Sequence, residues 1–420
     1  MDPLTAYGTI LFAMAIGFGL FMTWGIGAND VANAMGTSVG SGAISVRQAI
    51  VIAAIFEFAG AFLAGGHVTK TIRKGIIDPS NIVDTPEILV FGMLASLLAA
   101  GIWLLVASFK GWPVSTTHTI VGAVVGFALV GIGGDAVHWD KIGQIVASWV
   151  VSPVLGGFIA YMLMMSIRFL ILEKDDPFAM AKRWGPAYVF LVGFIISLVT
   201  MFKGLKHLDL DLSVEMSFVV SLGFGVFCAF IGWVLIQRVQ PDPVAEEKFR
   251  FDGVEKVFTP MMIFTACAMA FAHGSNDVAN GIGPMAAVIS ILDSGSVAQE
   301  STLPLWVLLT GGTGIVIGLA TLGYRVMQTI GTDITSLTPS RGFCATLAAA
   351  ATVVLASRTG LPVSTTHVAV GAVIGVGLSR GIGALDLRVI GVIFISWFVT
   401  LPAGAILAAF FFFTLKGAMG

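Results

Sequence analysis

Long apolar runs constrain this chain more than any other feature of its sequence. Several reach the ~18 residues that a helix needs to cross a bilayer, and they lack an alternating polar face. Of the 420 residues, 57% are hydrophobic and only 11% are charged, about half the charged share of a typical soluble protein. The sequence therefore predicts an all-α polytopic membrane protein.

Apolar runs separated by breakers give about twelve candidate membrane segments, a count that leaves room for re-entrant helical hairpins. They are 5–28, 45–66, 86–109, 113–133, 142–172, 184–202, 213–238, 259–275, 303–323, 341–357, 361–379 and 388–415. A charged connection from Arg238 to Lys256 divides the chain. We expect a first transmembrane repeat (1–175), two connecting spans with a cytoplasmic linker (176–252) and a second transmembrane repeat (253–420). With the N-terminus outside, 14 of the 22 basic residues lie on the cytoplasmic side, as the positive-inside rule favours.

Charge and cysteine content exclude other classes of protein. The net charge is −2 and no basic tract stands out, so we expect no nucleic-acid partner. Cys228, Cys267 and Cys344 are scattered within apolar stretches and form neither a disulfide framework nor a metal-ligand spacing. No ATP-binding loop and no nucleophile–base pattern occurs. We therefore expect neither an enzyme nor a bound cofactor.

Two motifs recur in the same order at nearly constant spacing. Gly-Ala-Asn-Asp-Val-Ala-Asn-Ala at 27–34 returns as Gly-Ser-Asn-Asp-Val-Ala-Asn-Gly at 274–281, displaced by 247 residues. Pro-Val-Ser-Thr-Thr-His at 113–118 returns unchanged at 362–367, displaced by 249 residues. This recurrence indicates a duplication. An odd number of predicted segments separates the copies of the first motif, which predicts inverted repeats, although a single re-entrant segment would change that parity.

The first motif places Asn and Asp side chains between apolar runs, where they are costly unless they pair or line a polar cavity. Nearby glycines permit a helix break, whose free carbonyls could join carboxylate and amide oxygens around a hard cation such as Na⁺. The alternative is a buried polar pair that locks helices together. The candidate Na⁺ ligands are Asn29, Asp30 and Asn33 and, in the second copy, Asn276, Asp277 and Asn280.

The second motif has the order of a helix N-terminus, with Pro near the start, hydroxyl residues next and then an apolar helix. Free N–H groups, hydroxyl donors and the positive end of a helix dipole together suit an oxyanion. The alternative is ordinary capping or hydrogen bonding between helices. The candidate ligands of this anion are Ser115, Thr116, Thr117, Ser364, Thr365 and Thr366, with Asp30 and Asp277 beside them.

The charges of these motifs predict coupling between an anion and a cation. Neither motif contains Lys or Arg. A dianion about 5 Å from both aspartates would be repelled by about 10 kcal/mol at an effective dielectric constant of about 20. A helix dipole stabilises a bound anion by only about 1 kcal/mol. If the motifs converge, bound cations or protonated aspartates are needed for the anion to bind.

Three further buried titratable residues have open roles. Glu57 lies within the predicted segment 45–66, and the position 247 residues further on is Pro304. It could gate or couple transport, or merely be paired. His118 and His367 end the second motif, where a structural hydrogen bond and a part in proton coupling are both open.

The duplicated motifs at 27–34, 274–281, 113–118 and 362–367 resemble the signature of the inorganic phosphate transporter (PiT) family. This resemblance implies inverted repeats with roughly twelve membrane segments, often in a homodimer. It also implies symport of inorganic phosphate with Na⁺ or H⁺, with Asp30 and Asp277 as essential acidic residues. The short connection between the halves fits a multi-pass protein of a prokaryotic plasma membrane.

We therefore expect a secondary active transporter that imports inorganic phosphate by symport with Na⁺ through alternating access. Sodium is preferred because amide oxygens accompany each aspartate, and amides bind metal ions but do not titrate. The alternatives are H⁺-coupled symport of phosphate or a metal–phosphate complex, sulfate symport and, from another class, a passive anion channel.

Overall fold

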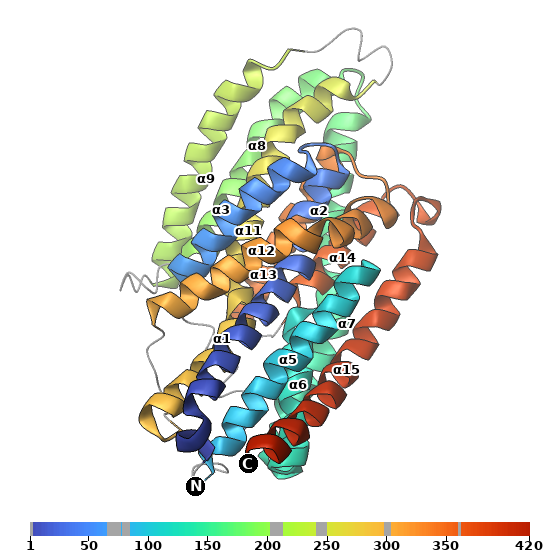
Figure 1. Cartoon of the computed structure of the whole chain (residues 1–420). Helices are drawn as coiled ribbons and strands as arrows, with labels where there is room; N and C mark the ends of the chain where they lie inside the picture. Colours follow the sequence, from blue (N-terminus) through green and yellow to red (C-terminus); the bar gives the residue numbers. More distant parts are fainter. Residues whose placement is uncertain are drawn as a thin grey trace.

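The computed structural model is built from helices throughout the part of the chain that it describes, which is 3–64, 77, 85–201, 213–240, 250–297, 304–359 and 363–420 (Figure 1). Each predicted apolar segment coincides with a helix. Those of the first half are α1 (Pro3–Asn29), α2 (Ala32–Gly40), α3 (Val46–Ala64), α5 (Pro86–Lys110), α6 (Thr116–Gly131) and α7 (Trp139–Ile167). The prediction of an all-α polytopic membrane protein is confirmed.

The middle of the chain supplies α8 (Pro177–Val199) and α9 (Val214–Gln237), which pack on each other. The second half contains α11 (Asp252–Ser294), α12 (Leu305–Gln328), α13 (Pro339–Thr359), α14 (Thr365–Leu378) and α15 (Leu387–Met419). Helix α11 extends well beyond the predicted segment 259–275 and carries the second Asn-Asp motif inside a continuous helix. Gly281, Gly283 and Pro284 follow Ser275, yet the helix continues through them, so the helix break that the nearby glycines permit occurs in the first copy and not in this one.

Helix length separates full crossings from shorter elements. Seven helical stretches among the described residues are long and apolar enough to cross a membrane. Helices α6 and α14 have 16 and 14 residues. At 1.5 Å per residue they reach only about 24 Å and 21 Å, less than the ~30 Å of a hydrocarbon core.

The chain segments that flank the α13–α14 pair meet at one end of the molecule. The Thr335 hydroxyl, before α13, donates to the Ala384 carbonyl, after α14, at 2.7 Å. The Asp386 N–H donates to the Ile334 carbonyl at 3.0 Å. The α13–α14 pair therefore returns to the side from which it entered. A bridge between Ile77 and Val137 joins the corresponding flanks of α5–α6 in the same way.

Helices of one half of the chain pack against helices of the other half, in two sets of equivalent pairs. Helix α1 packs on α12 as α11 packs on α3, and α7 packs on α14 as α15 packs on α6. Gly27 and Gly274 make the first pair of contacts possible. A Cβ added to Gly27 would lie 1.9 Å from the Ile315 carbonyl oxygen, and one added to Gly274 would lie 2.2 Å from that of Glu57. Equivalent glycines of the two repeats thus allow the same close approach between the backbones of two helices.

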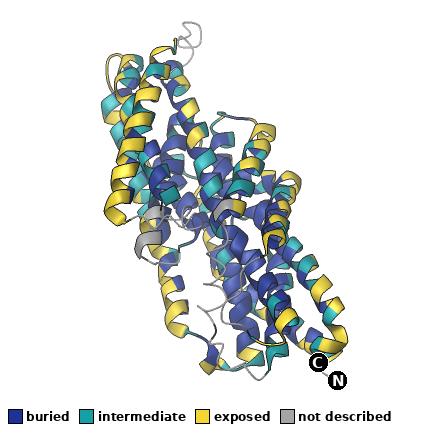
Figure 2. Ribbon diagram, turned by 90° about the vertical axis from the view of Figure 1, so that its left-hand side faces the viewer, coloured by how far each residue is buried: buried dark blue, intermediate teal, exposed yellow. Residues whose placement is uncertain are grey.

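Apolar side chains cover the outside of the molecule, whereas the polar motifs lie inside. Figure 2 shows buried residues concentrated in the middle of the bundle and exposed residues on its outer helices. On α9 and α15, Phe230 and Phe410 are 63% and 64% exposed. Large exposed aromatic side chains on long apolar helices are suited to lipid rather than to water.

Candidate functional site

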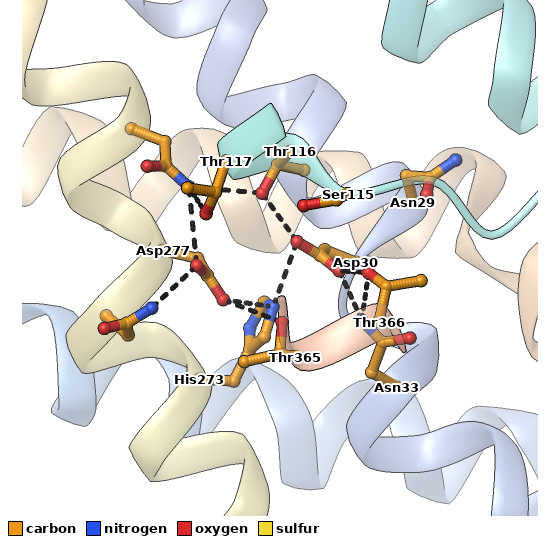
Figure 3. Close-up of polar contacts among 12 residues, drawn as sticks. Asn29, Asp30, Asn33, Ser115, Thr116, Thr117, His273, Asp277, Thr365 and Thr366 are labelled. Carbon is orange, nitrogen blue, oxygen red and sulfur yellow. Dashed lines mark hydrogen bonds and ion pairs between the residues drawn. The ribbon is translucent and has the colours of Figure 1, made fainter. Parts of the chain in front are cut away.

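Asp30 lies at a break between two helices. Helix α1 ends at Asn29 and α2 begins at Ala32, so Asp30 occupies the turn between them. Its carboxylate is 1% exposed and accepts hydrogen bonds from the hydroxyls of Thr116 and Thr366, both at 2.6 Å. The Asn33 amide also donates to it. One carboxylate therefore joins the N-termini of α6 and α14, which belong to different repeats (Figure 3).

Asp277 occupies the equivalent place in the second repeat without a helix break. It is 1% exposed and lies within α11. The Thr365 hydroxyl donates to its Oδ2 at 3.4 Å. The amides of Asn276 and Asn280 donate to its Oδ1 at 3.0 Å and 3.4 Å. The two aspartates thus each accept from the first Thr of their own repeat.

Two asparagines reach across to the opposite repeat. The Asn33 amide donates to the Thr366 hydroxyl at 2.9 Å. The Asn280 amide donates to the hydroxyls of Thr117 and Thr116 at 3.1 Å and 3.2 Å. Both contacts join the Asn of one repeat to the second Thr of the other. The cluster therefore exists only where the repeats meet.

A histidine that the sequence interpretation missed lies between the aspartates. His273 is 1% exposed, and its Nε2 lies 3.0 Å from Asp277 Oδ2 and 3.7 Å from Asp30 Oδ2. Its Nδ1 lies 2.9 Å from Glu57 Oε2. The signal was available, since His273 directly precedes the second motif copy and is polar at membrane depth. The first copy of the motif has Ile26 at the equivalent position, so the duplication alone does not point to His273.

The packing contacts also correct the assumed counterpart of Glu57. A displacement of 247 residues led to Pro304. In the structure, Gly274 packs on Glu57 as Gly27 packs on Ile315. The counterpart of Glu57 is therefore Ile315, because α3 and α12 are related by 258 residues rather than 247. The buried Glu57–His273 pair at the crossing of α3 and α11 is matched by Ile315 and Ile26 at the equivalent crossing of α12 and α1.

Ser115 and Ser364 cap the helices that carry the threonines. The Ser115 hydroxyl accepts from the His118 N–H, and the Ser364 hydroxyl accepts from the His367 N–H, each at 3.2 Å. Such caps begin α6 and α14 immediately before their threonines. The serines thus orient the helix ends at which the threonine hydroxyls gather.

Asn29 lies apart from the other candidate ligands. Its amide nitrogen donates to the Ser108 hydroxyl at 3.3 Å and to the Trp112 carbonyl at 3.0 Å. Its Oδ1 accepts from the Val114 N–H at 3.1 Å. Figure 3 shows Asn29 to one side of the cluster. Its polar atoms therefore hold the turn that leads into α6.

His118 and His367 contact each other rather than the aspartates. Their ring centroids are 4.8 Å apart in an edge-to-face arrangement. His118 also lies against Trp149, and His367 stacks on Trp397 at 3.7 Å. The two histidines join α6 and α14 directly behind the threonines.

The cluster offers ligands for both a cation and an anion. Oxygen and nitrogen atoms of Asp30, His273 and Asp277 all lie within 4.8 Å of one another, close enough to hold one metal ion. The Asn33 Oδ1 is buried without a hydrogen-bond partner, and an amide oxygen of this kind suits a hard cation. Four threonine hydroxyls and two capped helix N-termini supply donors that suit an oxyanion.

A membrane-embedded bundle with a buried, charged polar cluster between two repeats defines the class of membrane carriers. Residues 26–408 match the model of the phosphate transporter family. The chain belongs to this family, which comprises transporters rather than enzymes.

Individual relatives agree along nearly their whole length. A candidate phosphate permease of Haemophilus influenzae is 51% identical over 99% of both chains. Another from Pyrococcus abyssi is 45% identical over 98% of both. A solved structure described as the sodium-dependent phosphate transporter is 41% identical and superposes with a TM-score of 0.86, covering 97% of this chain and 99% of that one.

Proposed function

We propose that this member of the phosphate transporter family imports inorganic phosphate by symport with Na⁺ through alternating access. One observation carries the proposal. Asp30, Asp277 and the threonine hydroxyls of both repeats converge in one buried cluster. The similar solved structure is described as sodium-dependent, which favours Na⁺ as the coupling ion.

Phosphate would bind at the facing N-termini of α6 and α14. Thr116, Thr117, Thr365 and Thr366 would donate their hydroxyls to its oxygens. The serine caps would hold both helix ends in place, and the partial positive charge of each end favours an anion. To donate to phosphate, Thr116 and Thr366 must release Asp30, to which they now donate. Phosphate binding is therefore linked to the hydrogen bonds that the Asp30 carboxylate accepts, because both use the same threonine hydroxyls.

Sodium would take the carboxylate oxygens that those hydroxyls release. The carboxylate oxygens of Asp30 and Asp277 lie within 4.8 Å of each other, and two like charges at that distance repel each other by about 3 kcal/mol at an effective dielectric constant of about 20. A phosphate nearby adds further repulsion. One Na⁺ between Asp30 and Asp277, with the Asn33 Oδ1 as a neutral ligand, would remove most of this cost. Asn276 and Asn280 would contribute on the other side.

The position of the cluster supports alternating access. Its members come from both repeats, and Asp30 and Asp277 are each 1% exposed, so neither faces the exterior in this state. Rocking one repeat against the other would expose the cluster to one side at a time. The proposal also includes that the repeats are inverted and that the protein forms a homodimer. It further places the protein in a prokaryotic plasma membrane, which the relatives from Haemophilus influenzae and Pyrococcus abyssi support.

Proton-coupled phosphate symport is the second candidate, favoured by one observation. His273 lies between Glu57 and both aspartates, and a histidine in such a place could carry a proton in place of a sodium ion.

The test is uptake of radiolabelled phosphate into proteoliposomes under an inward Na⁺ gradient, an inward H⁺ gradient or neither. We expect uptake that requires Na⁺, is unaffected by excess sulfate and falls to background in Asp30→Asn and Asp277→Asn. Uptake driven only by H⁺ would favour the second candidate. Inhibition of phosphate uptake by sulfate would show that the protein also binds sulfate and is not specific for phosphate. Uptake that ignores both gradients and both substitutions would indicate a channel.

A further inference from the structure

A polar cavity lies at the end of the molecule where α14 finishes and α15 begins. Its volume is about 660 Å³, and charged side chains from three connected segments line it. Arg380 follows α14, Asp386 precedes α15 and Asp333 precedes α13. The Arg380 guanidinium donates to the Ser336 hydroxyl at 2.7 Å, and Arg341 donates to the Ser336 carbonyl at 3.4 Å. Two guanidinium groups thus meet at one residue.

The charges in this cavity do not neutralise one another directly. Among the residues that the structure describes, no carboxylate forms an ion pair with Arg380. Asp386 uses one oxygen to cap α15, and Asp333 accepts from Thr332. Arg380, with Arg341 beside it, is thus separate from the two carboxylates of the cavity, and this arrangement is complementary to a zwitterion that carries a phosphate and an ammonium group.

An apolar groove begins beside this polar cavity. Its volume is about 720 Å³ and it is lined by α7, α14 and α15, with Val150, Phe158, Leu378, Phe394 and Phe398 among the lining residues. Leu378 lies only two residues before Arg380. On α15, Leu387 of the polar cavity is followed by Phe394 and Phe398 of the groove at intervals of seven and four residues, which place all three on one helix face. The groove therefore continues from the polar cavity along the same surface.

The dimensions of the groove suit a hydrocarbon chain. Its lining on α7 runs from Val146 to Tyr161, a rise of about 22 Å along the helix. One leaflet of a bilayer core is about 15 Å thick. Val150 is 68% exposed and Phe398 is 65% exposed, so this surface faces the membrane.

From these observations we propose that one glycerophospholipid with a zwitterionic amine headgroup binds here. Its phosphate contacts Arg380, its ammonium group lies near Asp333 and Asp386, and one acyl chain occupies the groove. This site is separate from the threonine–aspartate cluster, and it would stand whether or not the proposed coupling ion is correct.

The test is native mass spectrometry of the delipidated protein titrated with palmitoyl-oleoyl phosphatidylethanolamine, the matching phosphatidylglycerol or the matching diacylglycerol. We expect one phosphatidylethanolamine to bind about tenfold more tightly than diacylglycerol, because a charge-assisted contact is worth about that factor. Arg380→Ala should abolish this preference. Val150→Trp, which fills the groove from an exposed position, should weaken both lipids. Arg388→Ala, at an exposed neighbouring arginine outside the cavity, should change neither.

Three outcomes would overturn the proposal. Equal affinity for phosphatidylethanolamine and diacylglycerol would show that the headgroup makes no favourable contact with Arg380. Tighter binding of phosphatidylglycerol would show that the two aspartates do not recognise the ammonium group. Displacement of bound lipid by inorganic phosphate in the wild type, lost in Arg380→Ala, would show that the cavity holds a free anion instead.

Discussion

The two copies of the Asn-Asp motif have nearly the same sequence but different surroundings. The first copy breaks its helix at Asp30, and the neighbouring contact between α1 and α12 carries Ile26 and Ile315. The second copy leaves α11 continuous, and the contact between α11 and α3 carries His273 and Glu57. The hydroxyl and amide groups of the cluster therefore follow the duplication, whereas the buried ionisable pair occurs at only one of the two equivalent helix crossings. That crossing joins the repeats, since Glu57 belongs to the first and His273 to the second.

Replacing the shared carboxylates should have the largest effect. Asp30→Asn and Asp277→Asn each remove a negative charge that a cation would neutralise, and we expect Na⁺-driven phosphate uptake to fall more than about 100-fold in both. Uptake by purified protein in proteoliposomes measures this. The Asp333→Asn variant, an aspartate outside the cluster, should retain wild-type uptake. If one substitution is tolerated and the other is not, the carboxylates are not equivalent.

Breaking the ionisable pair should cost more than truncating its apolar counterpart. Glu57→Ala removes the carboxylate that contacts His273 Nδ1, and losing one member of such a buried pair costs about 3–5 kcal/mol. Ile315→Ala, at the equivalent position, leaves only a cavity and should cost about 2–4 kcal/mol. Thermal unfolding in detergent, followed by tryptophan fluorescence, compares the two.

The effect on uptake distinguishes these variants more sharply than stability does. Glu57→Ala should also change the Na⁺ concentration needed for half-maximal uptake, while Ile315→Ala should leave it unchanged. An identical Na⁺ dependence in both variants would contradict the asymmetric role of Glu57.

The glycines at the two helix crossings should respond alike, because the packing there is shared. Gly27→Ala and Gly274→Ala both place a Cβ against a partner carbonyl oxygen, and we expect each to lower the free energy of unfolding by about 1–3 kcal/mol. Gly17→Ala on α1, where a Cβ would meet nothing within 4 Å, is the control. Removing the entropic cost of that glycine should stabilise the protein by about 0.5–1 kcal/mol.

The smallest effect should appear between the second threonines of the two motifs. Thr366 donates to a carboxylate, whereas Thr117 accepts from an amide. Hydrogen bonds to charged groups are worth about 1.5–3 kcal/mol and neutral ones about 1 kcal/mol. Thr366 must release Asp30 before it can donate to phosphate, so Thr366→Val also removes a contact that competes with phosphate. It should therefore weaken apparent phosphate affinity about fivefold less than Thr117→Val in uptake assays. Equal losses would mean that both hydroxyls act only on phosphate.

Much of the architecture could be predicted from residue patterns. Each predicted apolar segment coincides with a helix, because a run of this length has no other way to satisfy its backbone in lipid. The cap signature at Ser115 and Ser364 predicted where α6 and α14 begin. The candidate list also contained the threonines and aspartates that the structure brings together. These features depend on local sequence, so patterns are sufficient to find them.

Other features escaped prediction because they depend on contacts between distant segments. The displacement of 247 residues suggested Pro304 as the counterpart of Glu57, since nothing in the sequence shows that α3 and α12 are offset differently. Asn29 matches Asn276 in sequence, yet it bonds to the turn before α6. His273 became a candidate only when α3 placed Glu57 beside it.

By itself, the sequence determined that this protein is a membrane-embedded bundle of apolar helices with two copies of each polar motif. Hydrophobic length and helix caps act within one segment, and a duplication is visible along the chain. Only the tertiary structure decided which oxygens share a site and where the repeats differ. A hydrogen bond such as that between Thr366 and Asp30 joins residues 336 positions apart, and its existence depends on how α14 packs beside the turn between α1 and α2.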